Sequence, residues 1–442
     1  MDGERGTPEE RMQRGRSRRE AVSRAAQANL RPKERRFDPI DVLQASTEGR
    51  IPQLLPIKYA RMKVSPFAFF RGAVSIMAAD LGRLPNSSIH AQLCGDAHVQ
   101  NLGSFAAPDG KLVFDLNDFD ETIRGPWEWD VKRMAASIVL AGREAGHNRA
   151  GCRDAAETFV ESYCRSIGEF SRQPILQVAR HQIRREKSVE PIHAALRQSE
   201  RARPLDLLKK FTEADGHRRR RFRTLRPGLW RIRGAKAKEI LHSLRAYRKS
   251  LPPERRHLFD LFRGIDVGFK VVGTGSVGLR DYVVLFEGNG PQDPIFLQVK
   301  QEVASAYAKY LPEAAQPHPG RRAAEGQRAI QPISDLLLGW TTVGDHHYLV
   351  RQLNDRKGTI NLQTLAGVGL NSLAMVAGEL LARGHARSGD MCEIYGYCGS
   401  GLKMAKALRS FACEYADQTE ADYDAFLAAI KRGRIKVAKN AG

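Results

Sequence analysis

The sequence lacks a run of eighteen or more apolar residues, the approximate length that a membrane-spanning helix needs. Its N-terminus, MDGERGTPEERMQRGRSRRE, has no apolar segment after its charges and so lacks the pattern of a secretory signal. The six cysteines form no CxxC pair and no cluster with histidine, which argues against a zinc site and against a disulfide framework. We therefore expect a cytoplasmic protein with no membrane span and with reduced thiols.

Acidic residues are too few to balance the basic ones, because 71 Lys and Arg stand against 50 Asp and Glu and give a formal net charge of +21. This charge predicts an anionic partner or acceptor: a phosphorylated compound, an acidic membrane surface or a nucleic acid. Arginines are concentrated in the leader and in a central stretch that includes Arg218, Arg219, Arg220 and Arg221. Aromatic residues interleave with arginines there, as on nucleic-acid surfaces, although such runs are more often solvated helix faces.

The periodicity of apolar residues changes along the chain. Helical spacing is present in residues 57–83 and again from Trp129 to about Arg172. Residues 267–300 alternate as strands do, and a helix is expected from about Arg321 to Leu338. With 442 residues, of which 42% are apolar, the chain can bury a sizeable core. The pattern indicates a globular protein of the α+β class.

Two acid-rich segments carry residue types suited to phosphoryl transfer. GDAHVQN places Asp96 five residues before Asn101, and DLNDFDE places Asp118 and Asp120 in a loop a short hairpin later. One carboxylate can orient a hydroxyl group, while an amide oxygen and a second carboxylate hold Mg²⁺, which prefers oxygen ligands. The simpler interpretation is that these residues cap turns and helices. Their combined spacing favours the functional interpretation.

A glycine-rich turn, VVGTGSVGLRDYVV, contains the GxGxxG pattern in Gly273, Gly275 and Gly278, with Ser276 between them. The dinucleotide-binding version of this pattern requires a helix directly afterwards, whereas a strand is expected here. A glycine turn between two strands covers nucleotide phosphates in kinases, and the next strand then supplies a lysine. Lys300 in FLQVK occupies that place.

The helix expected after Lys300 carries Glu325, which can pair with the lysine and fix its ammonium group. Glu302 is the alternative partner for Lys300. A solvated surface position for Glu325 is the third possibility, and the sequence leaves the choice open.

These residues resemble the protein-kinase-like superfamily, and most closely its aminoglycoside phosphotransferase branch, in which a GD-x-H-x-x-N loop precedes a DF-containing metal loop. A wider set of segments, from about residue 50 to residue 435, resembles the bacterial family of uncharacterised proteins called DUF2252. The segments are SPFAFFRG, CGDAHVQNLG, LNDFDETIRGPWEWDVKRMAAS, VGTGSVG, FLQVK and LARGHARSGD. Cys94 stands where many relatives have histidine, and His98 is either a phosphate contact or a packed loop residue.

The resemblance implies ATP and Mg²⁺ as cofactors and a role for each matching residue. It implies that Asp96 is the catalytic-loop base and that Asn101 and Asp118 are catalytic residues that bind the metal. Asp120 is expected to assist at the metal, and Asp130 to brace the catalytic loop. The implied nucleotide-binding residues are Gly273, Gly275, Ser276, Gly278, Lys300 and Glu325.

The order of these elements differs from that in ordinary kinases, because Asp96 precedes the glycine turn. A circular permutation accounts for this order, since packing depends on adjacency in space rather than on the sequence of connections. A competing assignment takes the catalytic loop from GHARSGD, with His385, Arg387 and Asp390, but no Asn lies five residues beyond Asp390. The metal-ligand argument favours Asp96.

The expected fold is a bilobal, circularly permuted protein-kinase-like fold with a helical basic insertion. Its expected parts are a flexible Arg-rich leader (1–36), a catalytic-loop part of the large lobe (37–172), a basic helical insertion (173–260), a small nucleotide-binding lobe (261–360) and C-terminal helices of the large lobe (361–442). The expected function is ATP- and magnesium-dependent phosphotransfer to an acceptor that the sequence does not identify. The alternative is a nucleotide-binding pseudokinase or switch module that docks on nucleic acid through its basic segment.

Overall fold

The computed structural model describes residues 6–184, 189–201, 204–214, 220–271, 273–353 and 357–438. These residues form a mixed α+β fold of sixteen α-helices and fourteen strands, and every strand pair is antiparallel. Arg218 and Arg219 of the basic central stretch lie outside the described residues. Within the described part of the chain, no helix combines the length and apolar character needed to cross a membrane.

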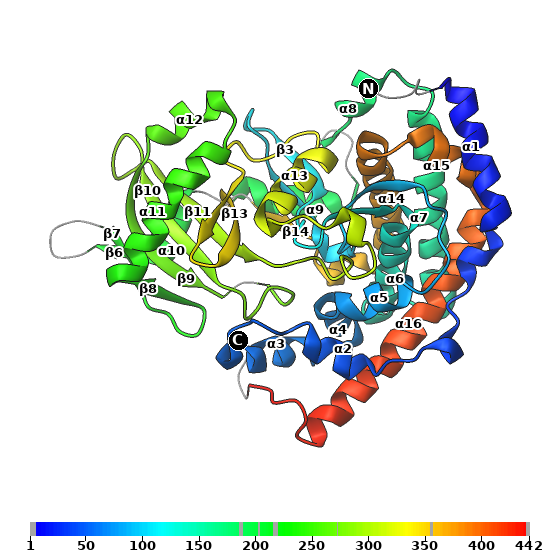
Figure 1. Cartoon of the computed structure of the whole chain (residues 1–442), viewed down its shortest axis with the longest axis horizontal. Coiled ribbons are helices and arrows are strands. Elements are labelled where there is room, and N and C mark those ends of the chain that lie inside the picture. Colours follow the sequence, from blue (N-terminus) through cyan, green and yellow to red (C-terminus); the bar gives the residue numbers. More distant parts are fainter. Residues whose placement is uncertain are drawn as a thin grey trace.

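A six-stranded sheet forms one side of the molecule (Figure 1). Its spatial order is β12 (Gly339–Val343), β13 (His346–Gln352), β11 (Pro294–Glu302), β10 (Asp281–Glu287), β9 (Arg263–Lys270) and β8 (Leu229–Ile232). The glycine-rich turn joins β9 to β10, and β11 pairs with β10 so that Lys300 lies opposite Asp281. The strands predicted over residues 267–300 are confirmed as β9, β10 and β11. Buried residues of these strands pack against α11 (Gly234–Ser250) and α12 (Pro253–Asp260).

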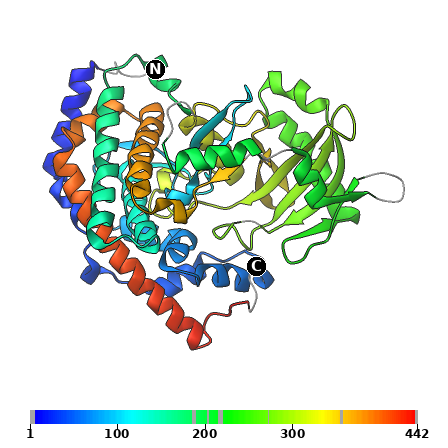
Figure 2. The same ribbon diagram turned by 180° about the vertical axis from the view of Figure 1, so that it is seen from behind.

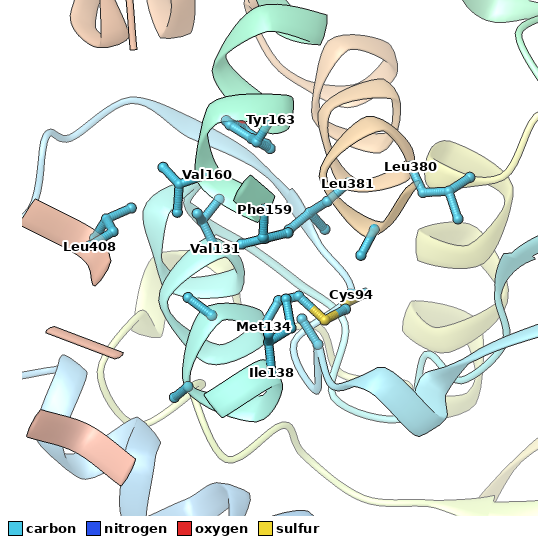
Figure 3. Packing of buried hydrophobic residues seen from close by; sticks show 14 of the residues in the cluster. Cys94, Val131, Met134, Ile138, Phe159, Val160, Tyr163, Leu380, Leu381 and Leu408 are labelled. Atoms are coloured by element: carbon cyan, nitrogen blue, oxygen red, sulfur yellow. The ribbon is translucent and has the colours of Figure 1, made fainter. Parts of the chain in front are cut away.

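Long helices form the other side, and both views show α7 and α14 side by side (Figures 1 and 2). They are α6 (Glu128–Glu144), α7 (Arg149–Phe170), α14 (Gly369–Ser388), α15 (Met391–Cys398) and α16 (Leu402–Lys431). Their apolar faces build the largest core, in which Cys94 lies beside Met134 and Ile138 of α6 (Figure 3). The six cysteines are free thiols, as the sequence predicts.

Two short sheets carry the acid-rich segments to the edge of this helical core. β1 (His90–Leu93) pairs with β4 (Ile123–Pro126), while β2 (Leu102–Ala106) and β3 (Leu112–Leu116) form a hairpin extended by β14 (Gly358–Thr359) and β5 (Ile183–Arg184). The loop after β1 contains Asp96 and the loop after β3 contains Asp118. Because the backbone N–H of Asn117 donates to Asn101 O (2.9 Å), the two loops lie directly against each other.

Four helices pack against both halves where they meet: α2 (Pro39–Ala45), α3 (Leu55–Met62), α4 (Pro66–Gly72) and α5 (Val74–Leu81). Ser65 begins α4, since its hydroxyl accepts from the backbone N–H of Ala68, and Pro66 occupies the first turn as predicted. The remaining elements are α1 (Pro8–Ala21), α8 (Ile175–Ala179), α9 (Ile192–Arg201), α10 (Pro204–Phe211), β6 (Thr212–Ala214), β7 (Arg220–Phe222) and α13 (Pro319–Ile330).

Several elements differ from the sequence-based expectation, among them the strands β5 to β8 in the segment expected to be a helical insertion. Helix α1 lies within the segment expected to be a flexible leader, and it packs on α15 through an ion pair of Arg11 with Asp390 (3.1 Å). Strand β8 lies within the expected helical insertion, where its pairing with β9 supplies an edge to the sheet. Helix α13 ends at Ile330 rather than near Leu338, because Pro332 removes a backbone donor and clashes with a continuing helix.

Candidate functional site

A cavity of about 770 Å³ lies between the sheet and the acid-rich loops. The glycine-rich turn contributes Gly273, Thr274, Gly275 and Ser276 to its wall, and β11 contributes Lys300. Residues from the other half of the molecule line the same space: Asp96, Asn101, Asp118 and Asp120. Three segments that are distant in the sequence therefore share one cavity.

Lys300 joins the sheet to the acid loop. Its ammonium lies 3.5 Å from Asp118 Oδ1 and forms a closer ion pair with Asp120 Oδ2. The lysine side chain is only 3% exposed, whereas the side chains of Asp118 and Asp120 are 46% and 20% exposed. Burial alone would lower the pKa of Lys300, but Asp118 and Asp120 outweigh it and hold this pKa above its usual value.

The pKa values of Asp118 and Asp120 are shifted in opposite directions. Burial works against the ionised form of Asp118, but the charges of Lys300 and Arg351 prevail and hold its pKa well below the usual range. Burial and the neighbouring charge of Asp118 raise the pKa of Asp120. Such divergent carboxylates in one cavity are typical of functional sites, although structural ion pairs produce the same effect.

Three buried oxygen atoms in this region accept no hydrogen bond from any described residue: Asn101 Oδ1, Asp118 Oδ1 and Asp120 Oδ1. The amide nitrogen of Asn101 donates to the backbone oxygens of Asp96 and Asp118 (both 3.0 Å), which fixes the orientation of its side chain. Carboxylate and amide oxygens suit Mg²⁺, and buried polar atoms need partners, so these three residues fit the ion. The described residues contain no group of three or more His, Cys, Asp or Glu side chains that could by themselves hold a metal ion. A site of two acids and one amide leaves further positions for water and phosphate oxygens.

Asp96 is held by a neighbour that sequence reasoning missed. Its Oδ1 accepts from Arg133 Nε at 2.7 Å, and the guanidinium of Arg133 is fully buried on α6. His98 Nε2 lies 3.7 Å from Asp96 Oδ2, and burial lowers the pKa of His98 to about 4. His98 is therefore neutral near pH 7, while the other side of the Asp96 carboxylate faces the cavity.

Asp130 braces the loop that contains Asp96, as the resemblance implies. Its carboxylate accepts from the backbone N–H groups of Cys94 (2.7 Å) and Gly95 (3.0 Å). His385 Nε2 lies 3.5 Å from Asp130 Oδ2, and Tyr163 forms a hydrogen bond of 2.8 Å with His385 Nδ1. Gly95 has φ +83° and would bring a Cβ to 2.1 Å from Glu121 O, so this tight turn requires glycine.

The glycine-rich turn is held inside the cavity by hydrogen bonds. Ser276 Oγ donates to Asp120 Oδ2 (2.9 Å), and Arg50 donates to Gly275 O (2.7 Å) and Val277 O (2.8 Å). Gly278 does not line the cavity, but its φ of +94° lets the turn pass close to Arg50. The turn thus occupies the position of a cover over Lys300 and the acids.

Glu325 does not reach Lys300. Its carboxylate accepts from Arg321 at 2.7 Å on the exposed side of α13, and it is absent from the cavity wall. Glu302 lies two residues after Lys300 on β11, lines the cavity and is buried. Burial and the charge of Asp120 raise the pKa of Glu302 well above its usual value. The geometry favours Glu302 over Glu325 as the acidic neighbour of Lys300.

The residues of the competing catalytic loop, GHARSGD, are engaged in contacts elsewhere. Asp390 begins α15, where its Oδ1 accepts from the backbone N–H of Cys392 (2.9 Å), and it pairs with Arg11. Neither Asp390 nor Arg387 lines the cavity. Among the two loops, only the one with Asp96 opens onto the glycine-rich turn.

Several basic residues of the cavity wall gave no signal in the sequence. They come from loops and helices on both sides of the cavity: Arg50, Lys58, Arg71, Lys270, Arg351 and Lys357. Lys357 is exposed at the mouth of this lining, and the charge of Arg351 acts to lower its pKa. Only the overall net charge of +21 hinted at such a lining.

Comparison with known proteins identifies one family. A family model described as an uncharacterized protein conserved in bacteria (DUF2252) matches residues 50–429. No curated protein and no solved structure matches the chain. The matched segment includes both acid-rich loops, the glycine-rich turn and Lys300, whereas helix α1 precedes it.

Proposed function

Because the chain belongs to the DUF2252 family of bacterial proteins, whose description assigns no reaction, its chemistry has to come from its own cavity, and we propose that it is an ATP- and magnesium-dependent phosphotransferase. One observation carries the proposal. Lys300, beneath the glycine-rich turn, pairs with Asp118 and Asp120 across the cavity that Asp96 and Asn101 also line. Anchors for phosphates and oxygen ligands for a cation therefore face one another, as phosphoryl transfer needs.

The order of elements in the sheet supports a kinase-like nucleotide lobe. The glycine-rich turn joins β9 to β10, Lys300 lies on the next strand β11, and helix α13 follows before β12 and β13. Protein kinases place their glycine loop, lysine and following helix in the same succession. Here the lobe comes after the acid-rich loops, so the proposed fold is a circularly permuted, bilobal relative of kinases.

In the proposed reaction, the oxygen of an acceptor hydroxyl attacks the γ-phosphorus of ATP. The bond from that phosphorus to the β–γ bridging oxygen breaks, and ADP and a phosphorylated acceptor are released. Asp96 orients the hydroxyl and accepts its proton, for which its cavity-facing side is available. Arg133 holds the other side and fixes the carboxylate in place. Lys300 binds the phosphates, and the turn from Gly273 to Ser276 covers them.

Asn101, Asp118 and Asp120 would hold magnesium, since each has a buried oxygen with no hydrogen-bond donor. When bound, the ion neutralises the negative charge on the phosphates during transfer. Asp120 presently accepts from Ser276 and pairs with Lys300, so nucleotide binding has to rearrange the contacts between the turn and this acid.

The proposal is tested by titrating the full chain with ATP, with and without magnesium. Binding that depends on magnesium and falls at least tenfold in Asp118→Asn supports the nucleotide site. Glu325→Gln is a matched control, because this acid lies outside the cavity and its loss should leave binding unchanged. Binding indifferent to both magnesium and Asp118→Asn would contradict the proposal.

A nucleotide-binding switch is the second candidate, and the Asp96–Arg133 pair favours it. The buried guanidinium of Arg133 occupies Asp96 Oδ1 at 2.7 Å, so this oxygen is engaged in a structural contact rather than free to orient an acceptor hydroxyl. Labelled ATP separates the two functions. Turnover that is lost in Asp96→Asn while nucleotide binding persists identifies the enzyme, whereas binding without any hydrolysis or transfer identifies the switch.

A further inference from the structure

Three buried polar atoms on residues of the cavity wall have no hydrogen-bond partner among the residues that the structure describes. They are Nε of Arg71 at the end of α4, Oγ of Ser75 in α5 and Nδ1 of His98 in the loop with Asp96. All three residues line the cavity, and each atom is buried. A buried donor without a partner is costly, and native proteins usually satisfy such groups with a ligand, an ion or water.

The same wall carries positive side chains that form no ion pair with an acid in the described part of the chain. The hydrogen bonds of Lys58 go to the backbone oxygens of Gly72 (3.1 Å), Thr274 (3.3 Å) and Gly275 (3.3 Å), and Arg50 donates to the oxygens of the glycine-rich turn. Among the described residues, no ion pair joins Arg50, Lys58 or Arg71 to an acid. Burial, with repulsion from Arg50, lowers the pKa of Lys58, and burial lowers the pKa of Arg71. An anion placed here would relieve both costs.

The nearby acids are already engaged. Asp96 binds Arg133, and Glu121 accepts from the backbone N–H of Ala306 at 2.7 Å. The negative charge that would satisfy this wall must therefore come from a ligand. A guanidinium, an ammonium and a hydroxyl that approach from different helices suit the several oxygens of a phosphate group.

We propose that Arg71, Ser75 and Lys58 form a subsite for the phosphate group of the acceptor, which makes the acceptor a hydroxyl compound that already carries a phosphate. This inference rests on the proposed phosphotransferase function. The subsite adjoins Asp96, since Arg71 and Lys58 both feel the charge of that carboxylate, and it lies at the tip of the glycine-rich turn. An acceptor held there by its phosphate presents its hydroxyl toward Asp96.

The same atoms suit the terminal phosphate of the nucleotide, so the test has to separate the two sources. The full chain is first saturated with magnesium and a non-hydrolysable ATP analogue and then titrated calorimetrically with inorganic phosphate and with glycerol 3-phosphate. We expect both to bind to the loaded protein. We expect Arg71→Met to weaken the binding of both compounds at least tenfold, since the loss of one charge-assisted hydrogen bond amounts to about tenfold or more. Ser75→Ala should weaken it severalfold. In both variants, affinity for the ATP analogue should stay within about twofold of the wild type.

Lys63→Met is the matched control, because it removes an exposed positive charge just after α3 and should leave both affinities unchanged. Retained binding of the analogue also shows that each variant is folded. The subsite is overturned if the loaded wild type does not bind phosphate, or if Arg71→Met loses affinity for the analogue and for phosphate equally. Either result leaves the phosphotransferase proposal standing. Failure of the wild type to bind the analogue overturns the phosphotransferase proposal, and the acceptor assignment with it, even where free phosphate still binds through Arg71.

Discussion

The ammonium of Lys300 lies 3.5 Å from Oδ1 of Asp118, which links the third strand of the six-stranded sheet to the loop after β3. Asp120 completes the group by pairing with the same ammonium. One buried cation thus balances two acids that belong to a distant segment of the chain. Its removal has consequences for both stability and ligand binding.

Lys300→Met should destabilise the protein by about 1–3 kcal/mol, because Asp118 and Asp120 lose a buried partner while their own side chains, 46% and 20% exposed, stay partly hydrated. Urea unfolding monitored by circular dichroism measures the change. The double variant Lys300→Met/Asp120→Asn should recover part of the loss, since it removes one of the unbalanced charges. Arg321→Met breaks the exposed pair with Glu325 instead and should cost less than about 1 kcal/mol. Equal effects of Lys300→Met and Arg321→Met would contradict the described burial.

Asp130→Asn should impair the loop that contains Asp96. An amide can accept from only one of the N–H groups of Cys94 and Gly95, and it turns its own donor toward the other. We expect a loss of about 1–3 kcal/mol in stability and a larger relative loss in phosphate transfer than in ATP binding. Asp390→Asn is the control, because it weakens the start of α15 away from the cavity and should leave transfer unchanged. Unchanged transfer in Asp130→Asn would remove the bracing role.

Asp281 should make stability depend on pH. Burial raises its pKa to about 7, although Lys300 and a hydrogen bond from Gln298 act in the opposite direction. Between pH 4 and 7 the unfolded chain ionises this acid while the folded protein keeps the proton, so stability falls as pH rises. The stability of Asp281→Asn relative to wild type should therefore increase by roughly 2–3 kcal/mol between pH 5 and pH 8. Chemical denaturation at both pH values measures it, and a constant difference would contradict the raised pKa.

Lys132 is a buried cation of α6 whose replacement should stabilise the protein. It lies over the ring of Phe411 at 4.7 Å and is 2% exposed, and burial lowers its pKa to about 8 despite the nearby charge of Glu128. The lysine is still charged at pH 7, so Lys132→Met should raise stability by roughly 1–3 kcal/mol there. Between about pH 8 and 10.5 the folded protein loses the Lys132 proton before the unfolded chain does, so the stability of the wild type rises with pH. The stability gained by Lys132→Met should therefore shrink over that range. Thermal unfolding at pH 7 and pH 10 distinguishes this from a constant packing effect.

Local patterns were sufficient to predict the strands of the site and the residues that converge there. The glycine spacing from Gly273 to Gly278, followed by a strand, indicated a turn of the kind that precedes a lysine-bearing strand, and the structure places Lys300 in the cavity beneath it. The acid-rich loops follow β1 and β3 as expected, because short apolar runs ending in Gly and Asp form strands that end in turns. These features depend on neighbours in the sequence.

The assignment of Glu325 failed because the rotation of a helix about its axis depends on tertiary packing. Gly326 lies against Thr122, where a Cβ would come within 2.4 Å of the hydroxyl, and Arg322 turns inward to donate to Asp120 O at 2.7 Å. These two contacts direct Glu325 outward to Arg321. Periodicity identifies a helix but does not choose its buried face when small and charged residues occupy it.

The basic wall and the arginine behind Asp96 were also beyond reach from the sequence. Arg133, Arg71 and Lys58 lie on three different helices, α6, α4 and α3, and they come together at the cavity only through tertiary packing. A sequence that contains 71 Lys and Arg offers no local signal to single these out.

The succession of the elements also affects how the protein is made. Asp118 and Asp120 leave the ribosome well before Lys300, since 180 residues separate Asp120 from the lysine. Helices α6 and α7 also emerge before Lys300, whereas α14, α15 and α16 follow it, so the first part of the helical half has to tolerate two uncompensated acids during translation. A nascent chain released before β11 is synthesised would expose an acidic loop with no counter-charge, and it would be a natural substrate for chaperones or proteases.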